Sequence, residues 1–204
     1  MTRVLKPLII AMLVLIFAIG GLAQSHKVGF FINAAGYFPS KKNINSGFGT
    51  GLGAVFHVSQ NIAVSVEWKY GRFNVDKKEG EFRKGTLYVT PLLASIRYKA
   101  KTRIALTPYV FGGGGIFFGN FRLDKSENLR EANVRKQEMN NGFGLFGGIG
   151  STYKLNEKMI LFVEGLFLWR KTEVNTIHID NSPSSTFTTD LSSVSILIGL
   201  SYFY

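Results

Sequence analysis

Five charged side chains stand in runs that are otherwise apolar or built from small residues, and they are the first candidates for chemistry. They are Glu67, Lys69, Arg97, Glu164 and Arg170. Carboxylates held beside cations can gate ions, or they can neutralise one another in salt bridges that hold a structure together. Either role requires that the elements carrying the five residues turn them toward a common interior.

Histidine and serine offer a second kind of chemistry. The three histidines, His26, His57 and His178, do not have the spacing of a metal site, and the chain has no cysteine, so neither a metal nor a disulfide is expected. His57-Val58-Ser59 places a potential base beside a potential nucleophile, and with a carboxylate such a pair can activate the serine. Because it abuts the short polar segment Ser59-Gln60-Asn61, we interpret the pair as flanking a turn.

A third candidate is the segment Gly142-Phe143-Gly144-Leu145-Phe146-Gly147, which matches the G-x-G-x-x-G pattern of dinucleotide-binding loops. That pattern needs a strand before it and a helix N-terminus after it to hold the pyrophosphate. Here glycines continue to Gly150, and they are similarly frequent at 47–53 and 112–115. We interpret them as glycines that line or bend strands, and no cofactor is expected.

The elements that must position these residues are β-strands. From residue 62 to 71, and again from 193 to 204, apolar side chains alternate with polar or small ones, and a period of two places them on opposite faces of a strand. Less regular runs fall at 27–38, 47–58, 84–99, 104–119, 141–154 and 158–171. The sequence therefore predicts about eight strands, each long enough to cross a bilayer at a barrel's tilt, which takes about 9–11 residues.

The connections between these runs alternate in length. Short ones fall near 59–61, 100–102 and 156–157, and longer polar or charged ones near 39–46, 75–83, 120–140 and 172–189. Short turns on one side and long loops on the other are typical of an antiparallel up-and-down transmembrane barrel, with turns in the periplasm and loops outside. The mixed charges of 120–140 indicate a solvated surface, although strands extended beyond the membrane and carrying a binding hairpin would also fit.

The first residues form a separate segment. Arg3 and Lys6 precede an apolar run from Leu8 to Ile19, and the small residues Gly21 and Ala23 stand three and one before the cut. This pattern predicts a cleaved signal peptide at 1–23 and a single barrel domain at 24–204. The chain is basic, with a formal net charge of +11. For an exported protein we expect outer-membrane lipids and lipopolysaccharide as partners, and no nucleic acid.

The polar face decides which side of the barrel meets lipid. A soluble barrel would expose Lys and Glu, whereas this face holds small residues: Gly49, Gly51, Gly53, Gly144, Gly148, Gly150, Ser195 and Ser201. Small residues suit the crowded inside of a narrow barrel, where Phe31 and Phe146 must also fit. The apolar face is therefore predicted to face lipid, and the five charges to point inward. Aromatic girdles are expected from Tyr37, Phe38, Trp68, Tyr70, Tyr98, Tyr153, Trp169, Tyr202 and Tyr204.

The final strand ends in Gly199-Leu200-Ser201-Tyr202-Phe203-Tyr204. With Gly199, Tyr202 and Tyr204 in their places, it resembles the C-terminal assembly signal of the small eight-stranded outer-membrane barrels, the group of outer-membrane proteins A and X, and especially their Bacteroidetes-type members. Leu197 departs from the polar residue usual there. The resemblance implies an outer-membrane location and recognition of this strand by the barrel assembly machinery during insertion, and we expect a monomer.

Three functions remain open at this point. The leading one is a non-enzymatic barrel with a structural or surface-interaction role, its interior plugged by polar and charged side chains. The second is a narrow porin-like channel. The third is a lipid-modifying enzyme similar to the outer-membrane lipid A deacylases, which carry a His-x-Ser arrangement, but the motif that surrounds it in that family is missing here. The fold itself hosts all three kinds of activity.

Overall fold

The computed structural model describes residues 28–77, 82–102, 104–124, 134–179 and 185–204. The expected signal peptide lies outside the described residues, and so do residues 125–133 of the charged segment 120–140. Within the described ranges, no helix is long and apolar enough to span a membrane. The barrel strands are β1 (Val28–Pro39), β2 (Gly47–His57), β3 (Ile62–Val75), β4 (Gly85–Lys99), β5 (Leu106–Leu123), β7 (Gly142–Lys154), β8 (Met159–Trp169) and β11 (Ser193–Phe203).

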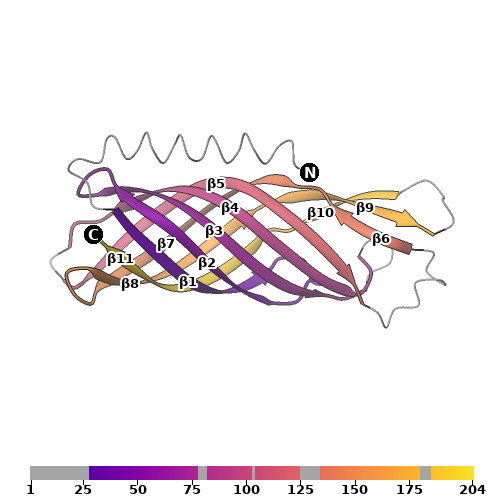
Figure 1. The fold of residues 1–204 in the computed structure, drawn as a ribbon, viewed down its shortest axis with the longest axis horizontal. Coiled ribbons are helices and arrows are strands. Elements are labelled where there is room, and N and C mark those ends of the chain that lie inside the picture. The colour runs from indigo at the N-terminus through magenta and orange to yellow at the C-terminus, as the bar shows by residue number, and fades with distance from the viewer. Residues whose placement is uncertain (1–27, 78–81, 103, 125–133, 180–184) are drawn as a thin grey trace.

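These eight strands form a closed antiparallel barrel in the order β1-β11-β8-β7-β5-β4-β3-β2 (Figure 1). Strands that are consecutive around the barrel pair antiparallel, and β11 pairs with β1 over Gly29–Pro39 to close the ring. Closure leaves no unpaired strand edge in the barrel wall. The predicted fold class and strand count are confirmed.

The predicted alternation of connection lengths is also confirmed. Residues 58–61, 100–105 and 155–158 connect strands at one end of the barrel, where the C-terminus also lies, and longer segments connect them at the other (Figure 1). The turn at 58–61 is held by Ser59, whose Oγ accepts from the backbone N–H groups of Asn61 and Ile62 at 3.3 and 3.1 Å. We call the two ends the short-turn end and the long-loop end.

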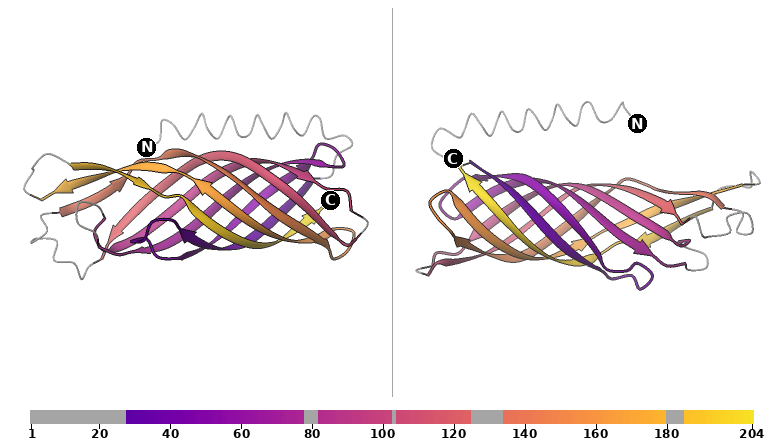
Figure 2. Two further views of the ribbon diagram at one scale, coloured as in Figure 1. Left: turned by 180° about the vertical axis from the view of Figure 1, so that it is seen from behind. Right: turned by 60° about the horizontal axis from the view of Figure 1, so that its bottom comes forward.

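Three further strands extend the long-loop end. β6 (Val134–Met139), β9 (Lys171–His178) and β10 (Ser185–Asp190) form a sheet in the order β10-β9-β6. Figure 2 shows this sheet projecting beyond the barrel. The segments 120–140 and 172–189, predicted as loops, thus contain strands. In β9 the β-branched residues Thr172, Val174 and Thr176 alternate on the buried face, a pattern that favours strand.

Burial alternates along the barrel strands as the period of two predicts. On β11, Ser195 is fully buried whereas 58% of Ile196 is exposed. Ser65, Glu67 and Ser201 are likewise buried, and Ile198 is exposed. The buried side chains fill the interior and the exposed apolar ones form the outer wall.

Glycines let the interior accommodate aromatic rings. A Cβ at Gly148 would lie 2.7 Å from Cζ of Phe111, and one at Gly199 would lie 2.7 Å from Cε1 of Phe162. Each of these glycines sits on a strand next to the one that carries the ring. A large side chain on one strand is thus matched by an absent one on its neighbour.

Candidate functional site

The first ion pair in the barrel interior lies on β3. Glu67 and Lys69 are two residues apart, so both point inward, and Lys69 Nζ lies 3.3 Å from Glu67 Oε2. Asn33 on β1 donates from Nδ2 to Glu67 Oε1 at 2.5 Å. Gly51, on the strand between them, leaves the space for this group, because a Cβ there would lie 2.7 Å from Glu67 Oε1.

The second ion pair joins β4 to β8. Arg97 Nη1 lies 3.1 Å from Glu164 Oε1, and both side chains are almost fully buried. Tyr109 on β5 donates its hydroxyl to the same carboxylate oxygen at 2.6 Å. The carboxylate of Glu164 therefore receives both a guanidinium and a phenol, which offset the cost of burying it.

Aromatic rings surround the Arg97 guanidinium. Its Cζ lies within 5.9 Å of four ring centroids, those of Phe31, Tyr109, Phe111 and Phe162. A cation over the faces of aromatic rings is stabilised electrostatically, more strongly where water is excluded.

Several of these contacts cross the lumen. β4 and β8 are separated by β5 and β7 around the barrel, β5 and β8 by β7, and β1 and β3 by β2. Side chains from strands that do not pair therefore meet inside the barrel. We call the group Asn33, Glu67, Lys69, Arg97, Tyr109 and Glu164 the ionic cluster.

Arg170 does not belong to the ionic cluster, although the sequence predicts the five interior charges as one group. It follows the last residue of β8, six residues beyond Glu164, which corresponds to about 20 Å along a strand. Its guanidinium instead stacks on Phe117, 4.9 Å from the ring centroid. The prediction of one cluster of five charges was wrong for Arg170, because residues that share a strand face can still lie far apart along the strand.

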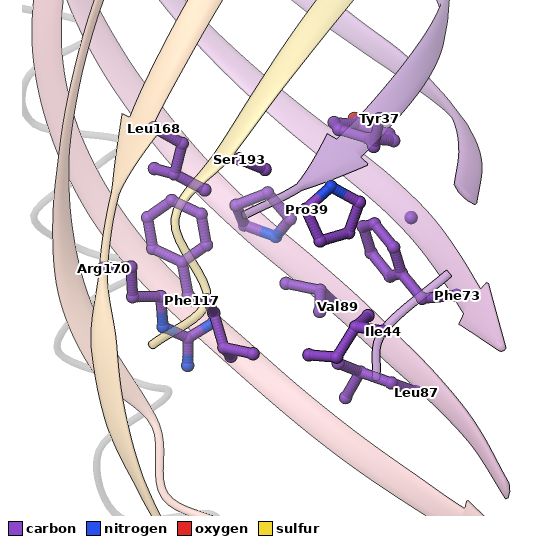
Figure 3. A pocket seen from close by; sticks show the side chains of 13 residues that line it. Tyr37, Pro39, Ile44, Phe73, Leu87, Val89, Phe117, Leu168, Arg170 and Ser193 are labelled. Atoms are coloured by element: carbon purple, nitrogen blue, oxygen red, sulfur yellow. The ribbon is translucent and has the colours of Figure 1, made fainter. Parts of the chain in front are cut away.

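Arg170 borders a pocket inside the long-loop half of the barrel (Figure 3). The cavity has a volume of about 50 Å³. Most of its walls are apolar, and among the described residues Arg170 is the one charged side chain that lines it. The described lining residues are Tyr37, Pro39, Ile44, Gly71, Phe73, Leu87, Val89, Pro91, Phe117, Leu168, Arg170, Leu191 and Ser193. We call this the outer pocket.

Comparison with known proteins identifies the fold. No protein-family model and no curated protein matches the sequence. Solved structures do match. The outer membrane protein OprG from Pseudomonas aeruginosa has a TM-score of 0.73 and 15% identity, over 87% of this chain and 95% of that one. The outer membrane protein AlkL in lipid bilayers has 0.58 and 17%, over 89% and 90%. Neisserial surface protein A has 0.56 and 14%, over 87% and 96%.

The chain has the fold of a small outer-membrane β-barrel. At these identities the likeness shows the fold alone, and it agrees with the outer-membrane location expected from the sequence. These comparisons do not confirm the narrower resemblance to barrels of the outer-membrane protein A and X type.

The structure places the other chemistry-bearing motifs at a strand end, in a turn and within a strand. His57 ends β2, where its ring stacks on Phe203 at 5.2 Å and its Nε2 is 2.6 Å from Lys99 Nζ. Ser59 is engaged in the turn described above. The glycine-rich segment from Gly142 lies within β7, with no helix after it. The described residues contain no cluster of His, Asp and Glu that could hold a metal ion.

The last strand shows local reasons for its sequence pattern. Gly199 faces the ring of Phe162, as noted, and Leu197 is fully buried in the same core cluster as Tyr109 and Phe111. Tyr202 and Tyr204 are exposed and pack edge to face, with ring centroids 5.3 Å apart. Their exposure at the short-turn end suits the expected girdle.

Tyr37 is a correction to that girdle. It was expected to face outward, but it packs against Phe73 and lines the outer pocket.

Two polar members of the ionic cluster, Asn33 and Tyr109, were missed at the sequence level. The signal that could have found them is strand parity, since Asn33 shares a face with Phe31 and Tyr109 with Phe111.

Proposed function

We propose that the protein is an integral outer-membrane barrel with a structural or surface-interaction role, whose ionic cluster closes the interior to ions. The observation that carries the proposal is the pair Arg97–Glu164, which bridges strands on different sides of the lumen at 3.1 Å. The four rings around Arg97 occupy the space beside this pair. A paired, desolvated arrangement of this kind favours a plug over a water-filled path.

Conductance in planar bilayers tests the closed interior. We expect the native protein to show no steady ion current, and the double variant Arg97→Ala/Glu164→Ala to show one, because it removes both partners without leaving an unpaired charge. Glu157→Ala, an exposed residue of a short turn, is the matched control and should leave the bilayer closed. Steady current through the native protein would favour the narrow porin-like channel, with the ionic cluster as its gate.

The sheet of β6, β9 and β10 supports the surface role. It extends past the barrel and carries exposed polar side chains, among them Thr186 and the ion pair Lys136–Glu138. In an outer-membrane barrel the long loops face outside. We therefore place this sheet at the cell surface, where basic side chains would meet lipopolysaccharide, and the short turns in the periplasm.

Thiol labelling of whole cells tests this orientation, since the chain has no cysteine of its own. Thr186→Cys should react with a membrane-impermeant maleimide in intact cells. Glu157→Cys should react only after the outer membrane is permeabilised. The reverse labelling pattern would mean that the short turns, and not the sheet, face the outside of the cell.

The C-terminal strand supports a proposal about assembly. β11 closes the ring against β1, and Gly199, Tyr202 and Tyr204 match the signal that the barrel assembly machinery recognises in the outer-membrane protein A and X type. We propose the same recognition here, and we propose that the protein works as a monomer without a cofactor or a catalytic role.

A further inference from the structure

Arg170 is buried without a counter-ion among the described residues. Only 2% of the residue is exposed. Its Nη2 donates to the backbone oxygen of Asn140 at 3.4 Å and approaches the sulfur of Met139 at 3.8 Å. Nε and Nη1 have no hydrogen-bond partner in the described structure, and the salt bridges found there do not include this residue. A guanidinium has five N–H donors, so most of its capacity is unused.

Arg170 also lines an apolar cavity. Arg170 lines the outer pocket together with Leu168, Phe117 and Val89, and Figure 3 shows its guanidinium below the Phe117 ring. An isolated cation in such surroundings is unfavourable unless an anion pairs with it. The ring of Phe117 compensates in part, but it satisfies none of the N–H groups.

The size of the cavity limits what can enter. A cavity needs about 10–15 Å³ to hold one water molecule. The outer pocket, with about 50 Å³, therefore holds about four groups of that size. That is room for a short stretch of a single unbranched chain. A branched or multi-chain lipid would not fit between Val89, Ile44 and Phe73, which form the walls opposite Arg170.

We propose that the outer pocket binds the head and first carbons of a single-chain amphiphile with one anionic group, such as a fatty-acid carboxylate. The anion pairs with the guanidinium of Arg170, and the chain lies along the apolar wall. A planar guanidinium presents two parallel donors to a carboxylate, which gives this pairing its geometric preference. The inference goes beyond the closed interior, because Arg170 lies about 20 Å along the strand from Glu164 and outside the ionic cluster.

Nuclear magnetic resonance of octanoate labelled with ¹³C at the carboxyl carbon measures this binding directly, with the protein in lipid nanodiscs and empty nanodiscs as the blank. We expect saturable binding that octyl sulfate displaces. Octanol and octyltrimethylammonium, which have the same chain but no anion, should displace the probe at least tenfold less effectively. Equal displacement by octanol would overturn the role of the charge.

Two variants locate the site. Arg170→Met should weaken octanoate binding at least tenfold, whereas Arg122→Met, at an exposed arginine on β5, should leave it unchanged. Val89→Phe keeps the charge but fills the cavity, and it should also abolish binding. Native affinity in both Arg170→Met and Val89→Phe, or no uptake by the native protein beyond that of empty nanodiscs, would refute the proposal. None of these measurements depends on whether the barrel conducts.

Discussion

Arg97 and Arg170 are both buried guanidiniums stacked on aromatic rings, and they differ in what else touches them. Arg97 meets Glu164 at 3.1 Å inside the ionic cluster. Arg170 meets a backbone oxygen, a sulfur and an apolar cavity. Removing a partner should therefore be costly in the first region, whereas adding one should be favourable in the second. This difference is why we propose that the barrel is closed at the level of Arg97 and binds a ligand at the level of Arg170.

The largest expected effect comes from breaking the Arg97–Glu164 pair. Glu164→Gln leaves a buried cation without its counter-ion and should lower the free energy of unfolding by about 3–5 kcal/mol. Urea unfolding in lipid vesicles, followed by tryptophan fluorescence, measures the loss. Glu157→Gln, on an exposed turn, is the control and should be neutral.

A double variant shows which charges are partners. Arg97→Met combined with Glu164→Gln should recover part of the loss, since no charge is then left unpaired. Arg97→Met combined with Glu67→Gln should not, because Glu67 pairs with Lys69. Equal recovery in both combinations would mean that the four charges act as one network.

A smaller effect is expected from the glycine that accommodates an aromatic ring next to the ionic cluster. Gly199→Ala places a Cβ against the ring of Phe162 and the backbone oxygen of Ile32 and should cost about 1–3 kcal/mol. Gly165→Ala, on the neighbouring strand, meets no atom within 4 Å and should change stability by less than about 0.5 kcal/mol. Similar losses for the two would show that strand propensity, rather than close packing at Gly199, sets the cost.

Arg170 should respond differently from Arg97. Arg170→Met leaves no described carboxylate unpaired, so the free energy of unfolding should change by less than about 1 kcal/mol. Arg97→Met, measured in the same vesicles, leaves Glu164 buried and unpaired and should cost about 3–5 kcal/mol. A loss of that size in Arg170→Met would reveal a counter-ion for Arg170 in the unliganded protein.

The sequence was sufficient for the barrel because its signals are local. The period of two in residues 62–71 and 193–204 depends only on neighbouring residues, and the alternation of turns and loops orders the strands. The sheet of β6, β9 and β10 was harder to predict, since polar alternation such as that of Thr172 and Thr176 resembles a solvated loop. Its pairing is set by contacts over distance.

The sequence predicted which charged side chains point into the barrel, but it did not predict which of them form ion pairs. Strand parity turns Glu67, Glu164 and Arg97 inward, yet which cation meets which anion depends on the stagger of the strands around the ring. That stagger pairs Glu164 with Arg97 and leaves Arg170 beside the outer pocket. A cavity depends on the shapes of many side chains at once, so no local sequence pattern predicts it.

The smallest expected effect concerns Asp190, at the junction between β10 and β11. Its side chain accepts from the backbone N–H of Ser192 at 2.8 Å, and hydrogen bonds from the side chain and backbone of Ser192 lower the pKa of Asp190 below its ordinary value of 3.8. A depressed pKa means that the folded state favours the carboxylate. The contribution of Asp190 to stability is therefore present above pH 3.8 and is lost as the pH falls through the lower pKa of the folded state.

The amide proton shift of Ser192, followed by nuclear magnetic resonance from pH 6 downward, should titrate with a midpoint below 3.8 and should not titrate in Asp190→Asn. Because the group is largely exposed, the change should remain at the junction and leave the ionic cluster intact. A midpoint at or above 3.8 would show that Ser192 does not hold the carboxylate in its charged form.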